Sequence, residues 1–145
     1  MNCTPVVDLA DIQRAYPLLA DGCSRVSQRE GEPFFAPALY AEIMAGNWVL
    51  FVVKDDQREP VGAFICRQQI DTRSGTGKLF VLLAYTVPGS GPEALEAGFA
   101  ACKRYAAQLG CSHVQFASKR IGWARRAQQL GYKPAQQLYE IEVQS

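Results

Sequence analysis

The stretch KLFVLLAYTVPGSGPEALEAGFAACKRYAAQLG, residues 78–110, decides the fold. Its first part, residues 78–87, is almost continuously apolar, which is typical of a buried strand. A glycine-rich loop at residues 88–91 follows. Apolar side chains then recur at 4-3-4-3 spacing, at Leu95, Phe99, Cys102, Ala106 and Leu109. This stripe predicts an amphipathic helix over residues 92–109, with the loop at its N-terminus.

Helices are predicted before this stretch as well. The expected elements are a short extended start, a helix, a loop and a second short helix, at residues 5–7, 9–26, 27–36 and 38–45. Asp8 is a good N-cap for the longer helix. Pro17 should kink or divide that helix, because proline lacks the N–H of a helical hydrogen bond. Pro37 suits the first turn of the second helix.

Apolar runs on either side of the central stretch predict a sheet. The expected strands are residues 48–53, 61–70, 78–87, 112–117 and 137–143, and a further helix is expected over residues 119–130. The last strand alternates, with the apolar residues Leu138, Ile141 and Val143 contrasting with the acidic residues Glu140 and Glu142. We therefore predict one domain over residues 1–145 with an α+β fold. Its mixed β-sheet is an antiparallel meander followed by a β-α-β-α-β tail, with helices on both faces. The strands at 78–87 and 112–117 should be parallel neighbours.

Composition limits the function. The chain has 145 residues, 48% of them hydrophobic, and a net charge of +1, which argues against a disordered chain and a strongly basic nucleic-acid binder. Its apolar runs are far shorter than the ~20 residues that span a bilayer, so no membrane partner is expected. Five cysteines without a Cys-x-x-Cys pair, and a single histidine, His113, predict free thiols, a reducing compartment and no metal site.

The glycine-rich loop is the first candidate site. Residues 89–94 satisfy the spacing of a dinucleotide-binding loop, but no carboxylate follows about twenty residues later, which argues against a nicotinamide cofactor. Glycine N–H groups and a helix N-terminus favour an anion. Pro92 removes one N–H, however, and Glu93 and Glu96 add negative charge. An anion site and a simple tight turn both stay open as interpretations.

Two motifs and the order of elements resemble the GNAT superfamily of N-acetyltransferases, over almost the whole chain. The sequence TVPGSG at residues 86–91 is similar to the family's pyrophosphate loop, Arg/Gln-x-x-Gly-x-Gly/Ala, except that Thr86 replaces the leading Arg or Gln. The sequence LGY at residues 130–132 is similar to the family's late signature. The resemblance implies acetyl-CoA as cofactor, in contact with Tyr85, Val87, Gly89, Ser90 and Gly91.

The same resemblance shows where this chain departs from the family's chemistry. In the family a tyrosine four residues before the late glycine protonates the departing CoA thiolate, and Ala127 occupies that position here. Arg120 replaces an asparagine that the family often carries early in the same helix. The remaining candidates for proton transfer are Tyr132 and Tyr139 as acids and Glu30 as the base for an amine.

A narrower resemblance involves residues 79–85 and 118–127, which look like small acetyltransferase-like proteins encoded by tailed bacteriophages. Such proteins often lie near virion genes, which implies a place in the host cytoplasm or in the virion. Because Thr86 replaces the leading Arg or Gln and Ala127 replaces the acid tyrosine, we expect a non-catalytic, virion-associated or protein-interaction component. The alternative is an acyl-CoA-dependent N-acetyltransferase that acts on a small-molecule or protein amine.

A basic cluster lies on the helix expected over residues 119–130, and it consists of Lys119, Arg120, Arg125 and Arg126. We expect it to contact a protein partner, such as a virion component, and the alternative is a solvated helix face. Nucleic acid is a poor fit, because no stacking aromatic side chains accompany these charges on that face.

Overall fold

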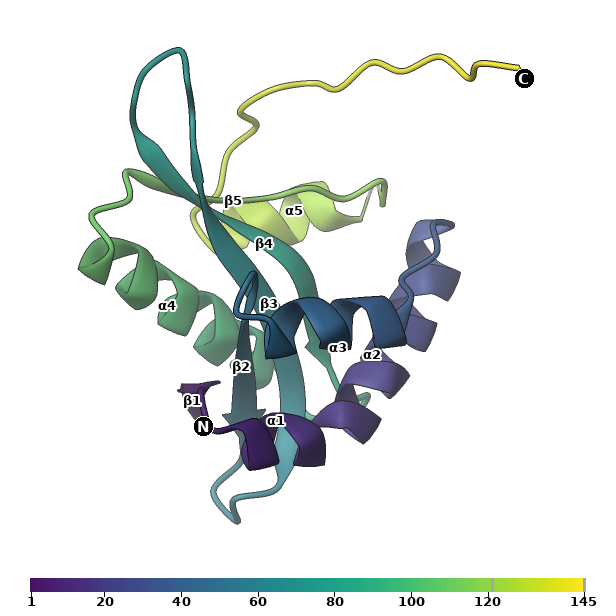
Figure 1. Cartoon of the computed structure of the whole chain (residues 1–145), viewed down its shortest axis with the longest axis vertical. Helices are drawn as coiled ribbons and strands as arrows, with labels where there is room; N and C mark the ends of the chain where they lie inside the picture. The colour runs from purple at the N-terminus through teal and green to yellow at the C-terminus, as the bar shows by residue number, and fades with distance from the viewer. Residues whose placement is uncertain (121, 145) are drawn as a thin grey trace.

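The computed structural model describes residues 1–120 and 122–144, and its centre is one mixed sheet with the strand order β1-β2-β3-β4-β5 (Figure 1). The strands are β1 (Asn2–Val6), β2 (Val49–Lys54), β3 (Pro60–Ile70), β4 (Gly77–Thr86) and β5 (His113–Phe116). The first four strands pair antiparallel, and β5 pairs parallel with β4. Helix α4 (Pro92–Gln108) makes the crossover between β4 and β5. The predicted fold class and the parallel pair are confirmed.

Four further helices complete the described chain: α1 (Leu9–Arg14), α2 (Tyr16–Glu30), α3 (Ala36–Met44) and α5 (Trp123–Gln129). The Asp8 carboxylate accepts a hydrogen bond from the Ala10 N–H at 2.8 Å, so Asp8 caps α1 as predicted. The break at Pro17 is also confirmed, because α2 starts at Tyr16 with that proline in its first turn. The loop predicted from residue 27 begins later, because α2 continues until Gly31 adopts the left-handed conformation, φ 71°, that ends it.

Each face of the sheet has its own apolar core. Helix α4 covers one face, and four of the five positions of its predicted stripe are buried there. Leu109 is the exception, because it lies at the end of the helix and is 37% exposed. Helices α1, α2 and α3 cover the other face, over a core that includes Leu19, Leu50 and Ile65. All five cysteines are free thiols, and four of them are buried.

Strand β4 changes faces at Leu82. Val81 and Leu83 pair with consecutive residues of β3, so Leu82 is an extra residue in β4, which defines a β-bulge. Val81 accordingly lies in the core under α4, whereas Tyr85 lies in the core under α1, α2 and α3. The bulge therefore turns Tyr85 toward α2, on the face of the sheet opposite α4.

The strand predicted over residues 137–143 is wrong. These residues form no strand within the part of the chain that is described, and they run away from the sheet (Figure 1). The side chains of Leu138, Tyr139, Ile141 and Val143 are 82% to 88% exposed. An alternating segment becomes a strand only where another backbone pairs with it, and none of the described strands pairs with this one.

The helix predicted over residues 119–130 is wrong at its start. It begins at Trp123, and the turn before it is held by Glu30, which accepts hydrogen bonds from Ser118 and Lys119. Lys119 and Arg120 of the basic cluster therefore precede α5, and only Arg125 and Arg126 lie on it. Residue 121, inside the predicted helix, lies outside the described residues.

Candidate functional site

Strands β4 and β5 separate halfway along the sheet. Only Lys78–Val81 of β4 pair with β5, and β4 continues to Thr86 without a partner on that edge among the described strands. The separation starts at the bulge, next to Leu82. An unpaired stretch of strand presents backbone N–H and C=O groups to any extended molecule that enters the gap. The free edge leads directly into the glycine-rich loop.

The loop at residues 87–91 is a tight turn before α4. Gly89 and Gly91 both have φ of 85°, a conformation that a side chain would strain. The Ser90 N–H and the Ser90 hydroxyl both donate to the Val87 carbonyl, at 3.1 and 2.6 Å. One loop amide is thus already used within the turn.

Glu93 decides how well this loop fits the pyrophosphate of acetyl-CoA. Its carboxylate folds back over Gly91, so closely that a Cβ on Gly91 would overlap it. The carboxylate therefore lies beside the residue that precedes the helix, where its negative charge opposes an anion bound at the helix N-terminus. Pro92 at the start of the helix removes an N–H as well. The residues present therefore fit a pyrophosphate poorly, because they supply a negative charge of their own and fewer donors.

Tyr85 is buried on the far side of β4 from α4, with 1% of its surface exposed. Its ring lies against Gly22 of α2, where an added Cβ would be 2.8 Å from the ring. Its hydroxyl donates a hydrogen bond to the Asp21 carboxylate, which also pairs with Arg25. Burial and this carboxylate raise the pKa of Tyr85 to about 12, and the Tyr85 hydroxyl lowers the pKa of Asp21. Tyr85 thus anchors α2 to the end of β4.

Glu30 joins the end of α2 to the connection between β5 and α5. Its carboxylate accepts hydrogen bonds from the Ser118 hydroxyl at 2.7 Å and from the Lys119 N–H at 2.8 Å. Glu32 forms an ion pair with the Lys119 ammonium. These contacts bridge the two sides of the sheet beyond the gap between β4 and β5. Both oxygens of Glu30 hold donors, which suits a positioning role in this structure.

The two candidate acid tyrosines lie apart from each other. Tyr132 packs on the α4 side, with its ring centroid 5.4 Å from that of Phe99 and 5.1 Å from that of Phe116. Burial raises the pKa of Tyr132 to about 12. Tyr139 lies in the exposed segment at residues 137–143. Of the predicted site residues, Tyr85 therefore points to Asp21 and Gly22 of α2, Tyr132 lies in the core under α4, and Tyr139 lies in the exposed segment.

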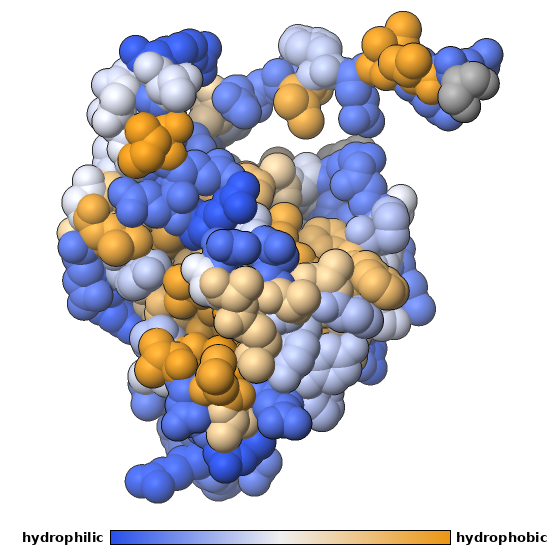
Figure 2. All heavy atoms as spheres, in the orientation of Figure 1, coloured by the Kyte–Doolittle hydropathy of each residue, from blue (hydrophilic) through white to orange (hydrophobic). Residues whose placement is uncertain are grey.

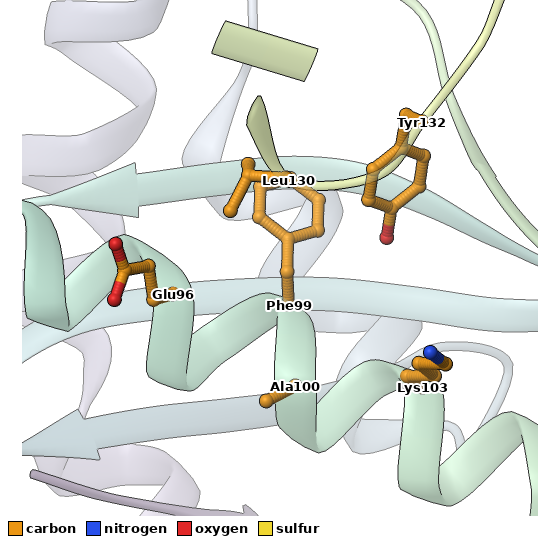
Figure 3. A pocket seen from close by; sticks show the side chains of 6 residues that line it. All are labelled: Glu96, Phe99, Ala100, Lys103, Leu130 and Tyr132. Carbon is orange, nitrogen blue, oxygen red and sulfur yellow. The ribbon is translucent and has the colours of Figure 1, made fainter. Parts of the chain in front are cut away.

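A shallow hollow of about 180 Å³ lies between α4 and the turn after α5 (Figure 3). Its lining residues are Glu96, Phe99, Ala100, Lys103, Leu130 and Tyr132. Figure 3 shows Phe99 rising from α4 toward Leu130. The glycine loop does not line this hollow. No group of three or more metal-ligating side chains occurs among residues 1–120 and 122–144, and none of their helices is long and apolar enough to cross a membrane.

The parallel β4–β5 pair that separates at a bulge, the glycine-rich loop and the crossover helix define the fold of the GNAT acetyltransferases. Comparison with solved structures gives the same result. A probable acetyltransferase superposes with a TM-score of 0.78 at 10% identity, over 100% of this chain and 99% of that one.

Two further structures have the same fold. A ribosomal-protein-alanine N-acetyltransferase from Brucella melitensis superposes with a TM-score of 0.75 at 14% identity, over 99% of this chain and 100% of that one. A GNAT family acetyltransferase from Staphylococcus aureus gives a TM-score of 0.67 at 11% identity, over the same shares. No family model and no curated protein matches the sequence. At these identities the likeness concerns the fold.

Sequence reasoning missed three residues of the site: Leu82, Asp21 and Gly22. The bulge at Leu82 has no sequence signal, because the surrounding residues 79–84 are all apolar. Gly22 does have one: a glycine in a helix interior costs about 1 kcal/mol relative to alanine, so it often marks a close contact. That contact is with Tyr85, and it explains why Asp21 next to it meets the Tyr85 hydroxyl.

Proposed function

We propose that this chain is a GNAT-fold protein that does not turn over acetyl-CoA and acts through contacts with other proteins. The observation that carries the proposal is the Glu93 carboxylate beside Gly91, which puts a negative charge next to the loop that would hold the anion. Thr86 brings no positive charge to offset this carboxylate, and Pro92 has no backbone N–H to donate. The bacteriophage resemblance adds the setting, a virion or a complex in the host cytoplasm.

The residue at the family's acid position supports the same proposal. Ala127 stands where the family resemblance expects a tyrosine, and Tyr132 is packed among aromatic rings. A phenol with a pKa of about 12 is a poor match for proton transfer near neutral pH. We infer that the basic cluster, with Lys119 and Arg120 before α5 and Arg125 and Arg126 on it, is the surface that contacts a protein partner.

Acyl transfer from acyl-CoA to an amine is the second candidate function. The free edge of β4 beyond Val81 favours it, since unpaired backbone groups beside a bulge suit an extended ligand. The two candidates differ in one measurable property, the affinity of the loop for acetyl-CoA.

Thermal unfolding with acetyl-CoA separates the two candidates. A ligand at a hundredfold excess over its Kd adds about 2.7 kcal/mol of stability, which corresponds to roughly 5–10 °C in a domain of this size. We expect a much smaller shift for the native chain at millimolar acetyl-CoA. A large, saturable shift would overturn the proposal, as would sustained acetyl transfer to amines.

The variants Glu93→Gln and Glu96→Gln test the physical reason. Both remove one negative charge from the first turns of α4, but only Glu93 lies over Gly91. We expect Glu93→Gln to bind acetyl-CoA more tightly than the native chain, and Glu96→Gln to change the affinity little. Equal effects of the two variants would show that net charge, and not the position of Glu93, weakens the loop.

A further inference from the structure

The Glu30–Glu32 segment, at the end of α2, already lies against the basic cluster. The Glu30 carboxylate accepts hydrogen bonds from the Ser118 hydroxyl at 2.7 Å and from the Lys119 N–H at 2.8 Å. Glu32 forms an ion pair with the Lys119 ammonium. Figure 2 shows hydrophilic side chains at the upper right of the view, where the end of α2 meets the turn after β5. A hydroxyl, an amide and an ammonium group of this turn therefore all bind carboxylates of the same chain.

The turn after β5 is arranged to donate hydrogen bonds to an anion. The Arg120 N–H donates to the Ser118 hydroxyl oxygen at 3.1 Å, so the hydroxyl hydrogen is left to point at Glu30. One amide and one hydroxyl thus form a chain of hydrogen bonds that ends on a carboxylate oxygen.

Carboxylates from two distant parts of the chain act on Lys119. The hydrogen bond to Glu32 raises the pKa of Lys119, and the charges of Glu140 and Glu30 raise it further. Glu30 and Glu32 come from the end of α2, whereas Glu140 comes from the segment after α5. Within the molecule, this surface therefore attracts carboxylates.

The contact with Glu32 is one that another carboxylate can replace. The side chains of Lys119 and Glu32 are 56% and 53% exposed, so water and salt compete with their ion pair. Gly31 ends α2 with a φ of 71°, and Glu32 follows it in the loop. Glu32 can therefore leave Lys119 without unfolding the helix.

The other three residues of the basic cluster remain available to a partner. Arg120, Arg125 and Arg126 form no ion pair with a carboxylate among residues 1–120 and 122–144. Arg120 and Arg125 are also exposed. An acidic segment longer than the Glu30–Glu32 segment would therefore gain contacts that the internal carboxylates do not make.

Nucleic acid fits this surface less well than an acidic protein. Trp123 is the aromatic residue within the sequence of the cluster, and its ring packs on Phe116 with centroids 5.4 Å apart. The Trp123 ring is partly buried in this contact and is not placed to stack on a base.

We propose that the basic cluster binds an acidic segment of another protein, and that the Glu30–Glu32 segment competes with this partner from within the chain. The carboxylates of the partner displace Glu32, and then Glu30, from the turn after β5. The internal carboxylates thereby weaken the binding of any partner that carries few acidic residues. This inference rests on the proposed function, because it names the chemistry of the protein partner and adds an internal control on its binding.

Fluorescence anisotropy of the full chain with a labelled oligoglutamate peptide tests the proposal. We expect Glu32→Gln to bind the peptide roughly fivefold more tightly than the native chain, which is the upper end of what an exposed ion pair contributes. Binding should weaken as salt is added, because it is driven by charge. Equal affinities of the native chain and Glu32→Gln, or no binding by either, would overturn the proposal.

Matched variants separate the position of a charge from the net charge. Glu42→Gln also removes one negative charge, but Glu42 lies on α3, where it accepts a hydrogen bond from Asn47. We expect it to change the affinity by less than about twofold. Arg125→Gln should weaken binding roughly fivefold, and Arg104→Gln on α4 by less than about twofold. These side chains are exposed, so the variants should fold. Equal effects within either pair of variants would show that only net charge matters and would refute the proposal.

An oligothymidylate with the same net charge as the peptide tests the source of the anion. We expect it to bind more weakly than the peptide, and tighter binding would assign the cluster to phosphates and overturn the proposal. Acetyl-CoA does not enter these measurements. Turnover of acetyl-CoA would refute the proposed function without changing the expected effect of Glu32→Gln, whereas equal peptide affinities would refute this inference alone.

Discussion

Gly98→Ala tests the packing of α4 on the sheet most directly. Gly98 is buried in the helix, and an added Cβ would overlap the Phe64 ring, with its Cδ1 atom at 2.6 Å. Phe64 is itself fully buried in β3, so its ring has little room to move. The helix would have to shift from the sheet, and overpacking of this kind costs about 3 kcal/mol at the upper end of its usual range.

The sign of the effect is informative because helix propensity predicts the opposite. Alanine is favoured over glycine in a helix interior by about 1 kcal/mol, so propensity alone predicts that Gly98→Ala stabilises the chain. We expect a net loss of about 2 kcal/mol, measured as a lower urea midpoint with unchanged slope. A raised midpoint would refute the packing argument.

Two controls separate packing from propensity. Ala100→Gly, at an exposed position of α4, should cost about 1 kcal/mol through propensity alone. Phe64→Leu combined with Gly98→Ala should cost less than the sum of the two single changes, because the smaller side chain leaves room for the methyl group. Additive costs would show that Gly98 and Phe64 do not compete for the same space.

Two further predictions concern the cores on either face of the sheet. The ring centroid of Phe99 lies 5.2 Å from those of Phe64 and Phe116. Phe99→Ala should therefore lower the free energy of unfolding, measured in urea, by about 3–5 kcal/mol. Phe35 is exposed, so Phe35→Ala should lower the free energy of unfolding by less than about 0.5 kcal/mol. Similar losses for the two variants would contradict the core assignment. Tyr85→Phe should cost about 1 kcal/mol near neutral pH, because the half-exposed Asp21 loses its hydrogen-bond donor. The Tyr85 hydroxyl lowers the pKa of Asp21, so the cost of Tyr85→Phe should be full above pH ~4. The cost should become smaller at lower pH, as the Asp21 carboxylate is protonated. A cost that does not change between about pH 2 and pH 7 would argue against the hydrogen-bonded pair.

Local sequence was sufficient for the βα unit at the centre of the fold. The apolar run of β4, the glycine loop and the apolar stripe of α4 can each be recognised within a short stretch of sequence. These patterns depend only on the local geometry of strands, turns and helices. The parallel pairing of β4 and β5 could also be predicted. A helix between two strands carries the chain back to the starting end of the first strand, so the next strand runs parallel beside it.

The candidate site depended on contacts that no local pattern encodes. Leu82 is a bulge only because β3 supplies one residue opposite two, and that register turns Tyr85 toward Asp21. The Glu93 side chain likewise adopts the conformation that puts its carboxylate beside Gly91, and the sequence does not determine that conformation.

Residues 137–143 mark the limit of the sequence most clearly. Their alternation predicts a strand, and the prediction concerns only which residues share a face. Whether a strand exists depends on a second backbone to pair with, and the described sheet offers the edge of β5 without bringing the segment to it. The amphipathic pattern can be read from one segment alone. Strand pairing needs two segments, so only tertiary or quaternary structure decides whether a strand forms.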